Sequence, residues 1–199
     1  MPGHIETEVK LHVPDLDAVA ARITAAGGTL AAPRVFERNL RYDDPEQHLT
    51  RGGIVLRLRQ DDRVRLTYKG PGVQDGDALS RLETEVTLDD FAGMDLILRK
   101  LGYAPYVTYE KYRTTYTLGE AEIVLDEMPY GNFVEIEAPA AVIRELIARL
   151  GLADRPRLAT SYLELFAHVK QALGLDVRDL TFADFAGVSV PPHVFEAFD

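Results

Sequence analysis

The chain has 199 residues, of which 46% are hydrophobic and 27% are charged, a composition that excludes a disordered chain, collagen and a coiled coil. It contains no cysteine, which excludes disulfides and thiolate metal sites. Its net charge of -10 argues against a nucleic-acid coat or a binder of anionic membranes. We find no secretory signal and no apolar stretch that could span a bilayer, and so we expect a cytoplasmic protein without nucleic-acid or membrane partners.

Period-two alternation of apolar and polar residues predicts eight strands. In chain order they span residues 4–13, 37–44, 53–60, 63–69, 81–88, 108–118, 121–128 and 132–138. Short turns join the third strand to the fourth, and the sixth to the seventh to the eighth. Turns of this length predict antiparallel neighbours.

Helices are predicted over residues 15–26, 89–101, 140–150 and 161–173, with a short helical turn over 181–185. The first, third and fourth end at glycine, and the second carries Arg99 and Lys100 in its last turn before Gly102. That order of charges suits the helix dipole. The tail from Gly174 onward is expected to pack on the body as irregular structure.

Charged residues gather on one face of almost every predicted strand. Bases dominate the third, fourth and sixth strands, and acids dominate the first, fifth, seventh and eighth. A half-buried strand is enough to explain one such face. It does not explain why nearly every strand carries two or more charges on that face. Two architectures fit: an open sheet with a charged solvent face, or a closed barrel with the charges inside. Charges in a barrel lumen are costly unless paired, so such a lumen should hold a polyanion together with cations.

The ordered motifs resemble the CYTH family, also called triphosphate tunnel metalloenzymes, which groups class IV adenylyl cyclases with thiamine and inorganic triphosphatases. The match begins at the ExExK motif Glu6-Thr7-Glu8-Val9-Lys10 and covers roughly residues 4–166. The later segments, in the family's order, are Leu56–Arg59, Leu66–Pro71, Glu83–Val86, Glu110–Arg113, Leu125–Glu127, Phe133–Glu137 and Ser161-Tyr162.

The resemblance implies a single domain over residues 1–199, of α+β class but mainly β. It favours the closed antiparallel eight-stranded barrel with helices packed outside, and a lumen that binds a triphosphate with Mg²⁺ or Mn²⁺. A homodimer is also expected from the family. The role of residues 174–199 is left open.

Roles follow from the resemblance, residue by residue. The predicted catalytic residues are Glu6, Glu8 and Lys10. The predicted metal ligands are Glu6, Glu8, Glu83, Glu85, Asp126, Glu135 and Glu137. The predicted substrate contacts are Lys10, Arg41, Arg57, Arg59, Arg65, Lys69, Lys111 and Arg113. Pairing of Glu83 and Glu85 with neighbouring bases is an equal alternative, Arg63 is expected on the surface, and many relatives carry an aromatic residue near Arg41.

The leading function is a class IV adenylyl cyclase that converts ATP to cyclic AMP and pyrophosphate. It is suggested by the Tyr68–Pro71 loop and the run from Asp126 to Glu137, which look like those of cyclases. The alternative is a triphosphatase that releases orthophosphate from inorganic or thiamine triphosphate. A non-catalytic module that binds polyphosphate or a nucleotide ranks third, because both acidic pairs are present.

Overall fold

The computed structural model describes residues 4–75 and 78–196, with side chains described from residue 7 to 73 and from 81 to 196. Within that part the strands are β1 His4–Val13, β2 Thr29–Asp43, β3 Val55–Gln60, β4 Val64–Lys69, β5 Val73–Asp75, β6 Ala78–Leu88, β7 Ala104–Leu118, β8 Ala121–Met128 and β9 Gly131–Glu137. The helices are α1 Leu16–Ala25, α2 His48–Arg51, α3 Phe91–Lys100, α4 Ala140–Arg149 and α5 Tyr162–Leu173, with a 3₁₀ turn over Pro192–Val194.

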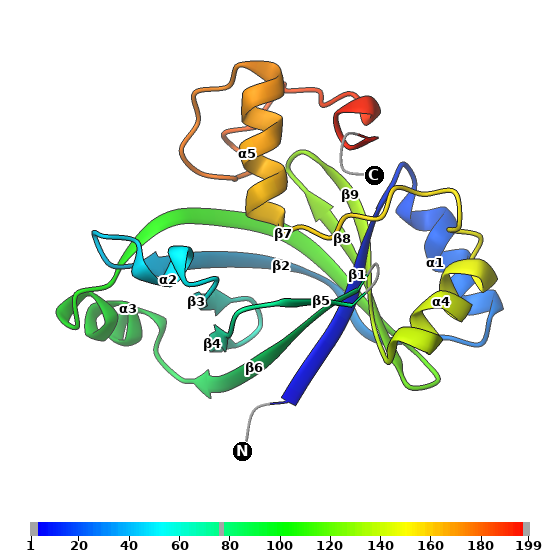
Figure 1. The fold of residues 1–199 in the computed structure, drawn as a ribbon, viewed down its shortest axis with the longest axis horizontal. Coiled ribbons are helices and arrows are strands. Elements are labelled where there is room, and N and C mark those ends of the chain that lie inside the picture. Colours follow the sequence, from blue (N-terminus) through cyan, green and yellow to red (C-terminus); the bar gives the residue numbers. More distant parts are fainter. Residues whose placement is uncertain (1–3, 76–77, 197–199) are drawn as a thin grey trace.

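The strands form one curved antiparallel sheet in the order β1-β9-β8-β7-β2-β3-β4-β6-β5 (Figure 1). The predicted antiparallel, mainly β architecture is therefore confirmed. The two ends of the sheet meet at β1, which pairs with β6 from His4 to Glu8 and with β9 from Glu8 to Val13.

The rows of paired residues do not run around the whole sheet. The row that starts at Val13 passes through Asn132, Glu127, Tyr112 and Phe36. It stops there, because β2 pairs with β3 only over residues 38–42. The hydrogen bonds thus give a curved sheet joined through β1, and they do not confirm the closed barrel predicted from the sequence.

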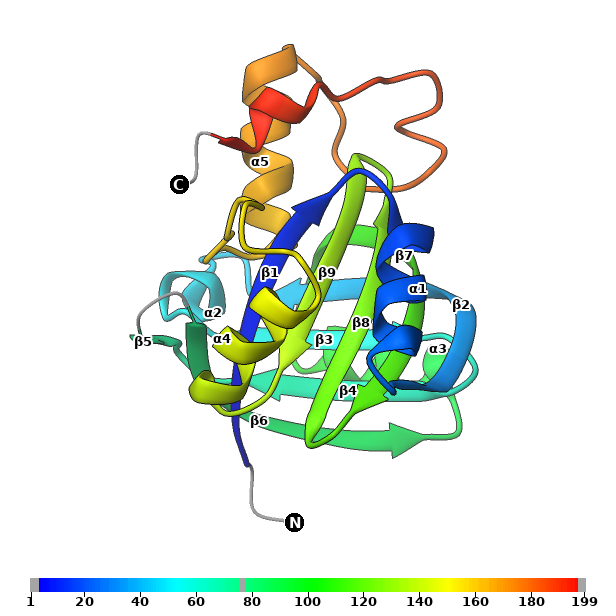
Figure 2. The same ribbon diagram turned by 90° about the vertical axis from the view of Figure 1, so that its right-hand side faces the viewer.

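Helices cover the outer, apolar face of the sheet. Helices α1 and α4 pack against β1, β8 and β9 through buried residues such as Val19, Ile147 and Ile136 (Figure 2). A further cluster places α3 against the outer face of β2 and β3. Helix α5 instead packs with the C-terminal tail at one end of the charged face, against Val107 of β7 and Phe133 of β9. With the outer face covered in this way, the charged face of the strands is turned inward.

Local capping explains where α1, α3 and α5 begin. Asp15 accepts a hydrogen bond from the Ala18 backbone at 3.0 Å, and Asp90 accepts one from Gly93 at 3.0 Å. Ser161 and Glu164 form a reciprocal capping box at the start of α5. The four long helices lie within the predicted ranges, and the tail packs as irregular structure as expected.

Four differences from the expected elements stand out. Strands β2 and β7 begin eight and four residues before the predicted starts. Both early segments contain a proline, Pro33 in β2 and Pro105 in β7, which weakened the alternation signal. Strand β5 and helix α2, of three and four residues, are too short to show a period and were not predicted. No helix among the described residues is long and apolar enough to cross a membrane.

Candidate functional site

A cavity of about 1060 Å³ lies on the inner face of the curved sheet. Its lining includes eleven Lys or Arg residues and seven Glu residues, although the whole chain carries a net charge of -10. Every predicted substrate contact lines it: Lys10, Arg41, Arg57, Arg59, Arg65, Lys69, Lys111 and Arg113. The cavity is therefore a positively charged interior in an acidic protein, as an anion-binding lumen requires.

One side of the cavity, which we call the basic wall, consists of Arg41, Arg57, Arg59 and Lys111 on β2, β3 and β7. Arg57 and Arg59 share a face because they are two residues apart on a strand. Arg57 lies opposite Arg41 in the ladder, and Arg59 lies opposite Asn39. Arg57, Arg59 and Lys111 are all buried, with at most 8% of their surface exposed.

The basic wall keeps donors available for an anion. Arg59 Nε donates to Asn39 Oδ1 at 3.1 Å, and Arg57 Nη1 donates to the Tyr109 hydroxyl at 3.3 Å. By contrast, the Nε atoms of Arg41 and Arg57 and the Nδ2 of Asn39 are buried without a hydrogen-bond partner in the structure. Buried donors of this kind are costly, and the oxygens of a phosphate chain would satisfy them.

Glu37 is the buried counter-ion of this wall, and it was not predicted as a site residue. Its carboxylate lies 3.3 Å from Arg59, 3.6 Å from Lys111 and 3.9 Å from Arg113, with 1% of the residue exposed. Burial raises the pKa of Glu37, but Lys111, Arg59 and Arg113 outweigh it and hold the pKa well below its usual value. Glu37 is therefore ionised and fixes the bases in place.

Asp126 lies behind the cavity lining. It is fully buried and accepts hydrogen bonds from Lys111 at 2.9 Å, from Arg113 at 2.6 Å and from the Tyr162 hydroxyl at 2.8 Å. Burial, together with Asp126 and Glu135, raises the pKa of Tyr162 well above its usual value, which keeps the hydroxyl protonated as a donor. In this geometry Asp126 orients the two bases, and it does not line the cavity.

Lys10 and Glu135 connect the two sides of the cavity. Lys10 Nζ lies 3.1 Å from Glu135, donates to the Thr160 carbonyl at 3.0 Å and sits 4.4 Å from the centre of the Tyr162 ring. Arg113 reaches Glu135 at 2.7 Å from the other side. Burial raises the pKa of Glu135, but Lys10 and Arg113 hold it well below its usual value.

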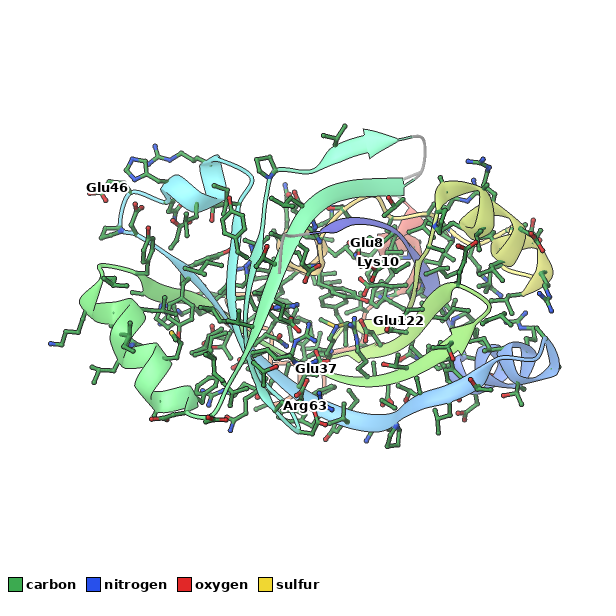
Figure 3. The ribbon with its side chains drawn as sticks, turned by 90° about the horizontal axis from the view of Figure 1, so that it is seen from below. Glu8, Lys10, Glu37, Glu46, Arg63 and Glu122 are labelled. Carbon is green, nitrogen blue, oxygen red and sulfur yellow. The ribbon has the colours of Figure 1, made fainter. Side chains whose placement is uncertain are left out.

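The opposite side of the cavity carries an acid row, which we define as Glu8, Glu137 and Glu122. Glu8 faces Glu137 across β1 and β9, and Glu137 faces Glu122 across β9 and β8. All three line the cavity, and Figure 3 shows Glu8, Lys10 and Glu122 around the central channel. Like charges directly opposite one another on a sheet repel, so bound cations would stabilise this row.

Strands β4 and β6 contribute mixed charges. Lys69 pairs with Glu83 at 2.7 Å, and Glu85 lies 3.7 Å from Arg57 and 3.8 Å from Arg65. Arg65 also pairs with Asp61. Glu83 and Glu85 thus have basic partners, the alternative that the sequence left open. Arg81, which was not predicted, lines the cavity and pairs with Glu8 at 3.2 Å.

Two further predictions have simple outcomes. The side chain of Glu6 lies outside the described residues, and its backbone pairs with Arg81 on β6. Arg63 lies on the surface as expected, with 66% of its side chain exposed (Figure 3).

A group separate from the lumen offers metal-ligand geometry. Asp44, Glu46 and His48 each present a ligand atom within 4.8 Å of the others, so this group could hold a metal ion. Among residues with described side chains, no three lumen carboxylates are gathered as closely. The three residues lie at or just before α2, on the exterior, and Figure 3 places Glu46 far from the channel.

The geometry agrees with comparisons to known proteins. The model of the CYTH domain family matches residues 4–148. The chain belongs to the CYTH domain family. An adenylate cyclase of Aeromonas hydrophila is 26% identical over 177 residues, which cover 82% of this chain and 89% of that protein.

Two solved structures share the fold. A Vibrio parahaemolyticus protein described as a candidate adenylate cyclase aligns with a TM-score of 0.71 and 24% identity, over 83% of this chain and 99% of that one. A Hippeastrum protein aligns with a TM-score of 0.61 and 18% identity, over 81% of this chain and 95% of that one. The Hippeastrum protein is described as a candidate adenylyl cyclase with a dominant triphosphatase activity.

Proposed function

We propose that this protein is a metal-dependent enzyme that acts on triphosphate substrates, with class IV adenylyl cyclase activity as its leading reaction. The observation that carries the proposal is a single cavity with a basic wall on one side and an acid row on the other. A phosphate chain needs the first, and its divalent cations need the second. The Aeromonas relative supports the cyclase reaction by its name.

The donor set fits a hard divalent cation. Glu8 and Glu137 line the cavity on neighbouring strands, with Glu135 two residues from Glu137, and carboxylate oxygens are what Mg²⁺ and Mn²⁺ prefer. The family resemblance adds Glu6 to these candidate ligands, while Glu83, Glu85 and Asp126 are less suited because bases already pair with them. When bound, the ion supplies positive charge to the phosphate oxygens and polarises the phosphorus.

The chain's own residues bind and orient the substrate. Arg57, Arg59 and Lys111 hold the phosphate chain from the basic wall, and Lys10 holds it from the side of β1. In the cyclase reaction the ribose 3′-oxygen attacks the α-phosphorus, and the bond from the α-phosphorus to the bridging oxygen breaks. Pyrophosphate leaves and the hydroxyl proton passes to solvent. Catalysis is then mainly positioning and electrostatic stabilisation.

The second candidate is a triphosphatase, in which water attacks the terminal phosphorus and orthophosphate leaves. The Hippeastrum protein, described with a dominant triphosphatase activity on the same fold, favours it. Hydrolysis needs only the grip on the triphosphate, so it is the less demanding reaction of this site. A non-catalytic binding module ranks third, because the acid row would serve no purpose in it.

Product analysis tests the proposal. Purified protein is incubated with ATP, inorganic triphosphate or thiamine triphosphate, each with Mg²⁺ or Mn²⁺, and cyclic AMP, pyrophosphate and orthophosphate are separated. Equal amounts of cyclic AMP and pyrophosphate from ATP are the expected result. Orthophosphate without cyclic AMP would establish the triphosphatase instead. No turnover of any substrate, with intact binding of triphosphate, would leave only the binding module.

A further inference from the structure

One edge of strand β7 is completed by the C-terminal tail. Strand β8 pairs with β7 only from Tyr112 to Leu118, while β2 occupies the other edge along the full length of β7. The edge of residues 104–111 would therefore be open. The segment Arg178–Leu180 lies along it: Leu180 N donates to the Thr108 carbonyl and Glu110 N donates to the Leu180 carbonyl, both at 2.9 Å.

Side chains reinforce this attachment. Asp179 Oδ1 accepts the Thr108 backbone N–H at 2.8 Å, and Arg178 Nη2 donates to the Pro105 carbonyl at 3.2 Å. Leu180 is fully buried, and Phe185 and Phe195 further along the tail are 4% and 1% exposed. The tail thus packs along the edge of β7 and extends the sheet there. Figure 1 shows the tail beside α5 above β7.

The tail and α5 together change the chemistry of this end of the cavity. Arg178 and Lys170 line it, with Glu164 at the start of α5. Between them lies an apolar group: Tyr106, Val107, Leu163, Phe166 and Ala167. Lys170 Nζ donates to the Val177 carbonyl at 3.0 Å and lies 5.0 Å from the centre of the Phe166 ring. Alternate residues along β7 change from Val107 to Tyr109 to Lys111 and Arg113, so the lining becomes cationic away from the tail.

We propose that this apolar end, completed by Arg178, is a subsite for the organic group of the substrate, an aromatic base carried on a nucleoside triphosphate. Apolar walls favour a ring over a further run of phosphates, because they desolvate it at little cost. A guanidinium at the rim can stack on a base or donate to its edge. Inorganic triphosphate has nothing to place there, so the subsite selects the nucleotide.

This inference rests on the proposed function for the binding of the triphosphate. It adds that the tail helps to select a nucleotide over inorganic triphosphate. The family model ends at residue 148, whereas Lys170 and Arg178 lie beyond it. The Vibrio structure is matched over 99% of its length by only 83% of this chain. The subsite therefore combines Tyr106 and Val107, inside the family match, with Lys170 and Arg178, outside it.

The test compares ATP with inorganic triphosphate in three variants. Arg178→Ala removes the guanidinium, and Ala167→Trp fills the apolar end without changing a charged residue. Arg144→Ala is the matched control, since Arg144 is exposed on α4. We expect Arg178→Ala and Ala167→Trp each to lower the ratio of kcat/KM for ATP to that for inorganic triphosphate by about tenfold. Arg178→Lys should restore part of the ratio, and Arg144→Ala should leave it at the wild-type value.

Calorimetric affinities of the two compounds, measured with Mg²⁺, separate this inference from the proposed function. A wild-type protein that turns over neither compound, but prefers ATP in binding and loses that preference in Arg178→Ala, keeps the subsite and overturns the enzyme. A ratio that stays at the wild-type value in both Arg178→Ala and Ala167→Trp, in binding and in turnover, overturns the subsite while leaving the enzyme intact.

Discussion

The basic wall and the acid row face one cavity, but they are stabilised in different ways. Three of the four bases are buried, and their internal counter-ion Glu37 lies within 4 Å of Arg59, Lys111 and the neighbouring Arg113. In the acid row, Glu8 pairs with Arg81, yet three carboxylates follow one another directly across β1, β9 and β8. One side thus has a buried counter-ion of its own, and on the other side bound cations would reduce the repulsion between neighbouring carboxylates. The comparison suggests that the bases set affinity and the acids set turnover.

The largest expected effect comes from the acid row. Glu8→Gln keeps the side-chain shape and removes the charge, so we expect kcat to fall about 10³-fold at saturating Mg²⁺. Triphosphate affinity, measured by calorimetry without metal, should stay the same or increase. Glu46→Gln, in the exterior acidic group, is the control and should retain wild-type kcat. Loss of activity in the control but not in Glu8→Gln would assign the metal to the exterior group.

The next effect concerns folding stability. Glu37→Gln removes the buried carboxylate that faces Arg59, Lys111 and Arg113. Lys111 and Arg113 keep Asp126, but Arg59 loses its buried counter-ion, and we expect the free energy of unfolding at pH 7 to fall by about 3 kcal/mol. The folded-state pKa of Glu37 is lowered, so its contribution is fully present above its unfolded pKa and is lost as the pH falls below that value. Urea unfolding should therefore show wild type and variant converging in acid. The exposed Glu145→Gln on α4 should change stability by less than about 0.5 kcal/mol.

Glu37→Gln also tests whether the negative charge of Glu37 limits triphosphate binding at the basic wall. With one negative charge removed from behind the basic wall, triphosphate affinity should rise although stability falls. An affinity that falls in parallel with stability would mean that Glu37 mainly positions the bases.

A smaller effect is expected within the basic wall. Arg57→Gln removes one charged contact to the phosphate chain and should weaken triphosphate binding about 30-fold, or about 2 kcal/mol. At saturating substrate the Arg57→Gln variant should keep most of the wild-type kcat, whereas Glu8→Gln should not. The triphosphate affinity of Arg57→Lys, which keeps the charge, should lie between those of the wild type and Arg57→Gln. A loss of kcat with KM unchanged would contradict a role in affinity.

The smallest effect is a pH dependence centred on Tyr109. Burial raises the pKa of Tyr109, but Arg57, Lys111 and Arg59 lower it to about 8. Deprotonation places a negative charge beside the phosphate chain, so triphosphate affinity should fall as the pH rises, by about twofold at pH 8. Calorimetry from pH 6.5 to pH 9 checks this, and Tyr109→Phe should bind equally across that range. The same decline in the variant would assign it to another group.

Much of this arrangement could be predicted from the sequence. Because side chains alternate along a strand, Arg57 and Arg59, or Glu135 and Glu137, could be assigned to one face without coordinates. The family resemblance then identified that face as the inside. Eight of the nine strands described and the four long helices were located by the same reasoning and by helix start and stop signals, although β2 begins eight residues and β7 four residues before the predicted start.

The features that could not be predicted depend on how deeply a side chain is buried and on contacts between segments far apart in the sequence. Glu37 begins a predicted strand and looks like any polar strand residue, and only the fold shows that it lies behind three bases. Asp126 and Glu122 are four residues apart on one face of β8, yet one is fully buried and the other is exposed. Arg178 lies in a segment without periodicity, so its approach to the cavity follows from the open edge of β7 and not from local sequence.

The split pairing of β1 has a consequence for how the chain folds. Its first half pairs with β6, as in His4 with Glu83, and its second half with β9, as in Val13 with Asn132. Strand β1 is synthesised well before β6 and β9, and contacts of such sequence separation form slowly. Lys10 and Glu8 therefore reach the cavity only when β9 docks. In a refolding experiment, the recovery of triphosphate binding should follow this last closure and lag behind the formation of the β2–β3–β4 meander.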